Sequence, residues 1–133
     1  MKKLSYIFLL YFFFIFSLGA VDIQQIKIVH LKRIIERAPT IYSINPEIIN
    51  NGILGSRMGI KDNNTTGKFT NQNFELIEKN IMPKESAKEI FEEFRKNKYK
   101  FFIINVSKDD FVKILSSDSM EGAILINTSL KDN

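Results

Sequence analysis

The stretch that decides the fold is GILGSRMGIKDNNTTGKFTNQNFEL, which runs from Gly52 to Leu76. Apolar residues at helical spacing predict a helix from about Pro46 to Asn63, because proline is favoured in a first helical turn. A polar string follows, and Gly67 at its end can adopt the left-handed conformation of a tight turn. Phe74 to Ile81 then forms a strand whose charged residues indicate the edge of a sheet. We therefore expect a helix, a polar loop and an edge strand.

Three glycines of this stretch are expected to share one helical face. Gly52, Gly55 and Gly59 are spaced at i, i+3 and i+7. Small residues on one face let a helix approach a sheet closely, so this face is predicted to pack against the strands. A membrane dimer built on Gly55 and Gly59 is the alternative, and Arg57 and Lys61 in the same stretch exclude it.

Outside this stretch, short apolar runs alternate with amphipathic segments, which is typical of βαβ units in a parallel sheet. Two serines, each followed three residues later by an acidic residue, predict the starts of two further helices. Right-handed crossovers then give an α/β fold of three layers with the parallel strand order 2-1-3-4. The remaining strands are expected at Ile26 to Leu31, Phe101 to Val106 and Ala123 to Ile126, and the helices at Ser86 and Ser107.

The run MGIKDNNTTGKFTNQNFEL, from Met58 to Leu76, closely resembles a segment of the substrate-binding proteins of ABC transporters. It is most similar to the branched-chain amino acid type, in the subgroup associated with PQQ-dependent alcohol dehydrogenase systems. The polar string Asp62 to Gly67 carries most of the match, and a weaker resemblance extends from Ile26 to Asn133. The resemblance implies a type I periplasmic binding fold with two lobes. This chain would then be an incomplete N-terminal lobe.

The same resemblance implies a function. The protein would capture a small solute in the periplasm and deliver it to an ABC permease in the inner membrane. Amino acids are the solutes of the wider family, and the subgroup suggests PQQ or a product of alcohol oxidation. The C-terminal lobe would be missing from this chain. The alternative is a stand-alone periplasmic interaction module, a truncated receptor lobe that binds another protein through the uncovered edge of its fourth strand.

The first twenty residues have the features of an export signal. Lys2 and Lys3 precede the apolar run Leu4 to Leu18, and small residues lead to Ala20. The apolar run has about 15 residues, fewer than the roughly 18 expected of a membrane-spanning helix. Cleavage after Ala20 is expected, which leaves the lobe at residues 21–133. An uncleaved anchor is the alternative, because Leu18 is a poor residue three positions before a cleavage site.

Composition excludes several other classes of protein. Without Lys2 and Lys3, 17 of the 19 basic residues remain against 15 acidic ones, a net charge of +2. Charges of both signs alternate, so no nucleic-acid-binding face is expected. The sequence has no cysteine and therefore no disulfide framework. Stability must come from an apolar core.

Open parallel sheets bind ligands outside the carboxyl ends of their strands. The loop after the fourth strand is the best candidate, because hydroxyls, an amide and main-chain N–H groups bind carboxylates; its alternative role is to cap a following helix. Arginines after the first strand suit a carboxylate or a quinone oxygen, although exposed arginines are often only solvated. The candidate ligand-binding residues are Arg33, Arg37, Tyr42, Ser107, Asn127, Thr128 and Ser129.

No catalytic set is recognised. His30 is the only histidine and is interpreted as a core or strand-end residue. There is no cysteine nucleophile, nucleophile elbow, phosphate-binding loop or cluster with the spacing of metal ligands. We therefore expect a protein that is not an enzyme and holds no cofactor or metal. The polar string Asn63 to Gly67 should lie at the amino ends of the strands, in a structural role.

Overall fold

A computed structural model describes residues 22–35 and 52–129 of the chain. The expected export signal, the expected helix start at Pro46, and the candidates Arg37 and Tyr42 lie outside the described residues. In chain order the elements are β1 (Gln24–Arg33), α2 (Ile53–Thr70), β2 (Gln72–Ile81), α3 (Ala87–Lys96), β3 (Phe101–Asn105), α4 (Lys108–Leu115), the 3-10 turn η1 (Asp118–Met120) and β4 (Ile124–Asn127).

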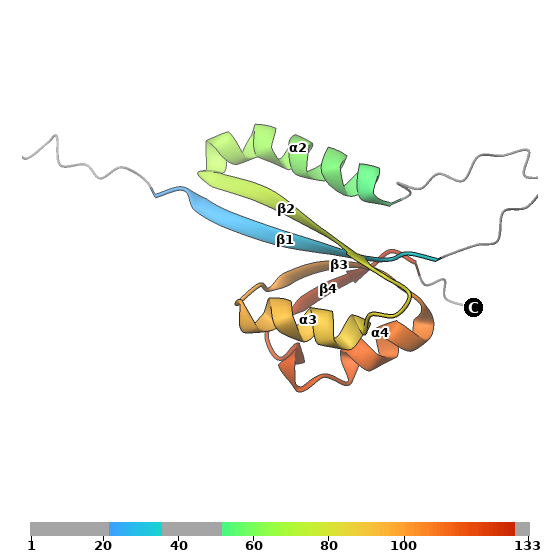
Figure 1. Cartoon of the computed structure of the whole chain (residues 1–133). Helices are drawn as coiled ribbons and strands as arrows, with labels where there is room; N and C mark the ends of the chain where they lie inside the picture. The colour runs from blue at the N-terminus through green and yellow to red at the C-terminus, as the bar shows by residue number, and fades with distance from the viewer. Residues whose placement is uncertain (1–21, 36–51, 130–133) are drawn as a thin grey trace, which may run out of the picture.

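The four strands form one parallel sheet of order β2-β1-β3-β4 (Figure 1). This confirms the predicted α/β fold class, strand order and edge position of β2. β1 pairs with β2 along its whole length, from Gln24 to Arg33, but with β3 only from Ile28 onward. The first residues of β1 therefore extend beyond β3.

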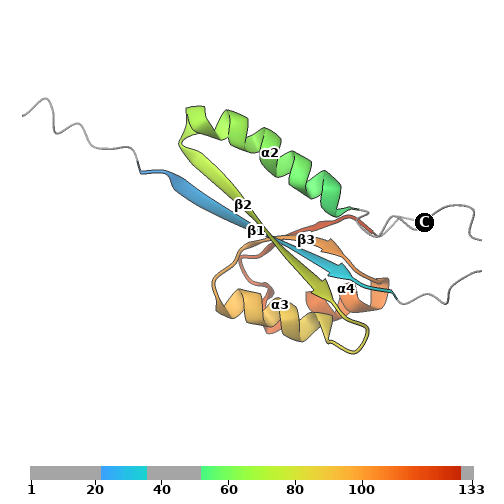
Figure 2. The ribbon, with the colours of Figure 1, turned by 45° about the horizontal axis from the view of Figure 1, so that its top comes forward.

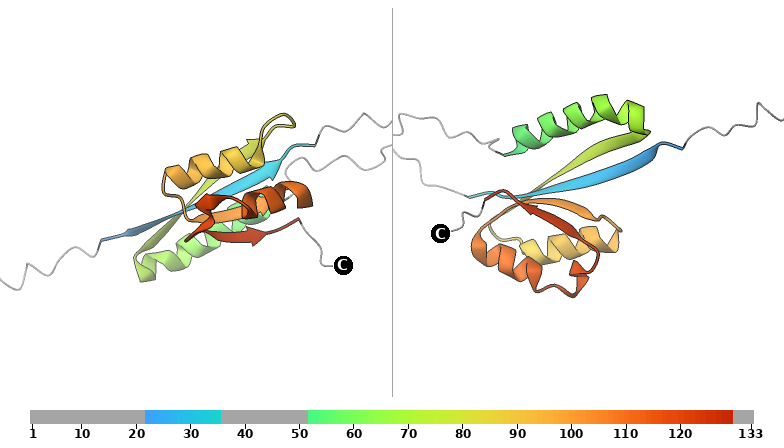
Figure 3. Two further views of the ribbon diagram at one scale, coloured as in Figure 1. Left: turned by 90° about the horizontal axis from the view of Figure 1, so that it is seen from below. Right: turned by 180° about the vertical axis from the view of Figure 1, so that it is seen from behind.

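Helices cover the two faces of the sheet unequally. α2 lies on one face beside β1 and β2, while α3 and α4 lie on the other (Figures 1 and 3). This division follows from right-handed crossovers, since the connection from β1 to β2 runs opposite to the next two along the sheet. The main core lies under α3 and α4, where the Phe91 and Phe102 rings have centroids 4.8 Å apart. Its fully buried side chains include Val29, Leu31, Phe91, Phe102, Ile104 and Ile114.

Both predicted helix caps are confirmed. The Ser86 Oγ accepts a hydrogen bond from the Glu89 N–H at 3.3 Å, and α3 begins at the next residue. The Ser107 Oγ accepts from the Asp110 N–H at 3.2 Å, and α4 begins immediately after it. Each hydroxyl satisfies one amide that the first helical turn leaves without a partner.

The expected polar loop is wrong, because α2 continues through it to Thr70. The Asn64 side chain bonds across to β2, accepting from the Phe74 N–H at 2.7 Å and donating to the Phe74 carbonyl at 2.9 Å. These bonds cover the outer edge of β2. The left-handed residue that ends the helix is Asn71, with φ of 53°, and not Gly67. Asparagine tolerates this conformation better than most residues.

The expected sheet-facing glycine stripe is wrong at Gly55 and Gly59, and of the three glycines only Gly52 lies close to the strands. A Cβ added at Gly55 or Gly59 would meet no atom within 4 Å, and Met58 between them is 67% exposed. A second close approach occurs at the other end of α2, where a Cβ on Gly67 would lie 2.3 Å from the Gln72 carbonyl oxygen. The tight connection to β2 therefore fixes how α2 is rotated about its axis.

One part of the sheet has little cover. Ile124 and Ile126 of β4 are 56% and 58% exposed, on the face where α2 packs mainly on β2 at the other edge of the sheet. No helix in the described ranges lies over this side of β4, and no strand there pairs with its outer edge. The sequence predicted such exposed apolar surface at the fourth strand.

Candidate functional site

The carboxyl ends of β1 and β3 define the place where a ligand site is expected. The connection that follows β1 leads to β2 on one side, and the connection that follows β3 leads to β4 on the other. Ligands of open parallel sheets bind at such a switch point. Figure 2 shows the strand arrowheads and the start of α2 at this same end of the molecule. We call this region the carboxyl edge, defined by Gly52 to Ser56, Asn105 to Lys108 and Asn127 to Ser129.

The predicted loop after β4 is held firmly against the end of β3. Thr128 donates to the Ile104 carbonyl through its N–H at 3.0 Å and its Oγ1 at 3.2 Å. The Ser129 Oγ donates to the Val106 carbonyl at 2.7 Å, and the Asn127 Oδ1 accepts from the Ser129 N–H at 3.0 Å. The structure thus brings Asn127, Thr128 and Ser129 together with Ser107, which directly follows Val106. Thr128 and Ser129 remain exposed and can accept further hydrogen bonds through their hydroxyl oxygens.

Arg33 lies at the end of β1, where its guanidinium is engaged with protein acceptors. It contacts the Asp110 carboxylate through Nε at 2.9 Å and Nη2 at 2.8 Å, with both side chains under 20% exposed. Its Nη1 donates to the carbonyls of Met82 and Glu85 at 2.7 and 2.9 Å. Arg33 therefore joins β1, the loop before α3 and the start of α4. Its position at the edge was predicted, but its contacts are those of a structural residue.

The structure adds a contact between β1 and the start of α2 that the sequence did not predict. His30 is fully buried, as predicted, and its Nδ1 lies 2.8 Å from the Ser56 Oγ on α2. The Ser56 hydroxyl in turn donates to the Gly52 carbonyl at 3.3 Å. The Ser56 hydroxyl, while donating to the Gly52 carbonyl, can accept from Nδ1, and in that tautomer Nε2 is an acceptor. None of the described residues gives Nε2 a partner.

Gly52 fits the start of α2 closely onto this group. Its φ is +87°, and a Cβ there would lie 2.9 Å from the Asn105 Nδ2 and 3.9 Å from the His30 Cε1. α2 has no acidic residue in its first turn and no side-chain cap. The amides of its first turn therefore place partial positive charge at the carboxyl edge. These contacts could not be predicted from local sequence patterns, because they join the start of α2 to strand residues far away in the sequence.

Burial lowers the pKa of His30 below its ordinary value; nearby Glu78 raises it, and Lys32 lowers it further. The folded protein therefore holds His30 neutral near pH 7, while the unfolded chain takes up a proton as the pH falls through about 6.5. Because the unfolded state binds more protons, burial of neutral His30 is fully compatible with stability above pH 6.5. The free energy of unfolding then decreases as the pH falls from 6.5 toward the lowered pKa of His30 in the folded protein.

Acidification from pH 7 to pH 5.5 should therefore lower the unfolding free energy more in the wild type than in a His30→Gln variant. The glutamine can keep a hydrogen bond to Ser56 but does not titrate. One proton contributes at most about 1.4 kcal/mol per pH unit. Urea unfolding at both pH values measures the difference, and identical pH dependence in the two proteins would show that His30 is not held neutral by burial.

Comparisons with protein-family models, with curated proteins and with solved structures find no match for this chain. Within the described ranges, no three His, Cys, Asp or Glu side chains lie close enough together to hold a metal ion. No helix there has the length and apolarity needed to cross a membrane.

The carboxyl edge presents exposed hydroxyls, an asparagine and helix amides, which are groups suited to binding a small polar molecule.

Proposed function

We propose that the protein is a lobe of a periplasmic solute-binding protein that serves an ABC transporter, and that it binds a small carboxylate-bearing solute at the carboxyl edge. The observation that carries this proposal is the gathering of polar groups at the switch point between β1 and β3. The transporter part is supported by the resemblance of Met58 to Leu76. Export to the periplasm and delivery to a permease belong to the same proposal.

Two sets of groups would receive the solute. The first-turn amides of α2 suit its carboxylate, since α2 has no acidic first-turn residue to compete for them. The hydroxyls of Thr128 and Ser129 already donate to the Ile104 and Val106 carbonyls, so their oxygens suit a donor group of the solute, such as an ammonium. Arg33 and Ser107 act indirectly by holding α4 in place.

A single lobe should bind solute weakly. Two-lobed receptors bury most of a small ligand between their lobes, whereas one lobe offers only one wall. We expect millimolar dissociation constants, or about 4 kcal/mol, in calorimetric titrations with amino acids and with PQQ. Thr128→Val should weaken binding, and Thr65→Val, exposed on α2 toward its far end, should not. Absence of binding by any of these carboxylates, or micromolar binding by a monomer, would contradict the proposal of a single lobe.

The exposed side of β4 favours a second candidate, a stand-alone interaction module. Ile124 and Ile126 present apolar side chains beside an outer strand edge that no described strand pairs with. Such an edge is a template for another strand. Association at increasing protein concentration in sedimentation, in a protein that binds none of the titrated solutes, would favour this module over the solute-binding lobe.

A further inference from the structure

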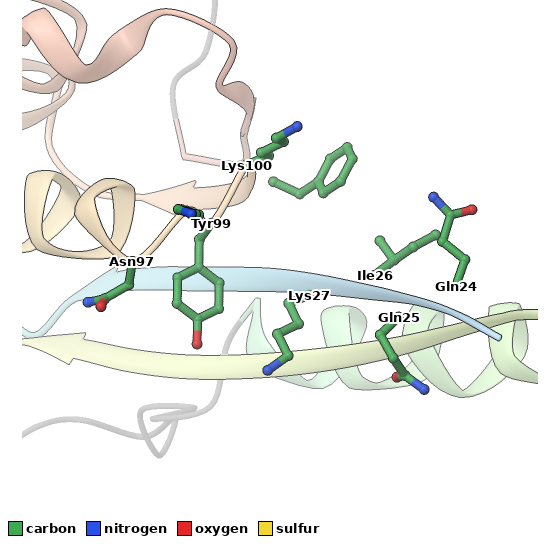
Figure 4. Close-up of a pocket in the computed structure, with 9 residues that line it drawn as sticks. Gln24, Gln25, Ile26, Lys27, Asn97, Tyr99 and Lys100 are labelled. Carbon is green, nitrogen blue, oxygen red and sulfur yellow. The ribbon is translucent and has the colours of Figure 1, made fainter. Parts of the chain in front are cut away.

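A cavity of about 420 Å³ lies at the opposite edge of the sheet, where the strands begin (Figure 4). It is lined by Gln24 to Lys27 of β1 and by Asn97 to Phe101, the turn that leads from α3 into β3. β1 pairs with β3 only from Ile28 onward. The cavity therefore occupies the place that β3 would fill if it began four residues earlier.

The backbone of β1 is open toward this cavity. The Gln24 N–H donates to the Asn71 carbonyl at 2.8 Å, on the side of β2. Backbone groups of successive residues in a parallel strand alternate between the two sides. Gln25 therefore directs its N–H and carbonyl, and Lys27 its N–H, toward the cavity, where no described strand pairs with them. The Lys27 carbonyl belongs to the first rung shared with β3, at the pair Ile28↔Phe101. An extended segment placed there could add a short strand to β1.

The cavity is positively charged. Three lysines line it, Lys27, Lys98 and Lys100, and no acidic residue does. Figure 4 shows Lys100 on the side of β1 where β3 begins, whereas the Lys27 side chain extends toward β2. Lys27 approaches Glu75 at 3.7 Å, but both side chains are about half exposed. Such an exposed pair holds its members weakly.

We propose that this cavity binds the carboxyl-terminal segment of a partner polypeptide as a short strand parallel to β1. A segment in line with β3 and parallel to β1 ends where β3 begins, beside Lys100. Its terminal carboxylate is then close to the lysines. The antiparallel direction places an ammonium group there instead. A free anion would leave the edge of Gln25 and Lys27 without a partner, so the geometry favours a peptide.

The test uses the fluorescently labelled pentapeptide Val-Thr-Val-Glu-Asp with a free carboxyl terminus, and the same peptide as its carboxamide. Fluorescence anisotropy should show the free acid binding roughly five- to ten-fold more tightly than the carboxamide, because the carboxamide lacks the terminal carboxylate. Lys100→Glu and Lys98→Glu should each weaken binding of the free-acid peptide by a similar factor. Lys61→Glu, which makes the same charge change at an exposed site on α2, should have no effect.

Amide chemical shifts distinguish strand addition from simple attraction between charges. The free-acid peptide should shift the Gln25 and Lys27 amides and slow the hydrogen exchange of Lys27, whereas inorganic phosphate should do neither. Equal affinity of the two peptides, no binding of the free acid, or shifts confined to lysine side chains would overturn the proposal. The solute site lies at the other edge of the sheet, so loss of either site leaves the test of the other intact.

Discussion

Replacing Arg33 with alanine should lower the free energy of unfolding by about 3 kcal/mol, because its guanidinium is nearly buried in an ion pair. The substitution leaves the Asp110 carboxylate, only 16% exposed, without its cation. It also removes the donor that both the Met82 and Glu85 carbonyls share. Urea unfolding monitored by circular dichroism measures the change.

Arg57→Ala is the matched control. Arg57 also makes two contacts to one carboxylate, at 2.6 and 2.8 Å from the two Glu78 oxygens, but its side chain is 53% exposed. Water replaces an exposed partner at little cost, so this variant should lose far less stability. If the two variants lost the same amount, the guanidinium of Arg33 would be an ordinary solvated group, available to a ligand.

Gly67→Ala should destabilise the protein by about 2 kcal/mol, because its methyl group must displace backbone and not a flexible side chain. The added Cβ would lie 2.3 Å from the carbonyl oxygen of Gln72, the first residue of β2. Thermal unfolding of the variant and the wild type measures the loss.

The same substitution at Gly59 provides the control within one helix. A Cβ at Gly59 meets nothing within 4 Å, and alanine is favoured over glycine in a helix by up to about 1 kcal/mol. Gly59→Ala should therefore stabilise the protein slightly. Two variants of equal stability would mean that the end of α2 does not pack on the start of β2 as described.

The alternation of strands and helices, from which the strand order follows, could be predicted because the signals for each element are local and strong. Ser86 and Ser107 cap helices through bonds to residues three positions away, and Phe101 to Asn105 reads as a buried strand. The polar string was misread because its decisive contact is not local. Asn64 bonds to the backbone of β2, which lets the helix continue through residues that favour turns.

The candidate site divides in the same way. Ser107 and the loop from Asn127 to Ser129 could be placed at the carboxyl edge, because each directly follows a predicted strand. The partners of Arg33 come from a loop and a helix at sequence separations of 49 to 77 residues, which no spacing rule reveals. The contact between His30 and Ser56 joins β1 to α2 across 26 residues. Such contacts depend on how the elements pack.

The measurement that tests the proposed function most directly is a solute titration followed by amide chemical shifts. Millimolar amino acid or PQQ should shift the amides of Ile53 to Ser56 and of Asn127 to Ser129, together with the ring signal of His30, the only histidine in the sequence. The amides of Gln24 to Lys27, at the other edge, should not move. Shifts at that other edge, or no shifts anywhere, would contradict a solute site at the carboxyl edge of the sheet.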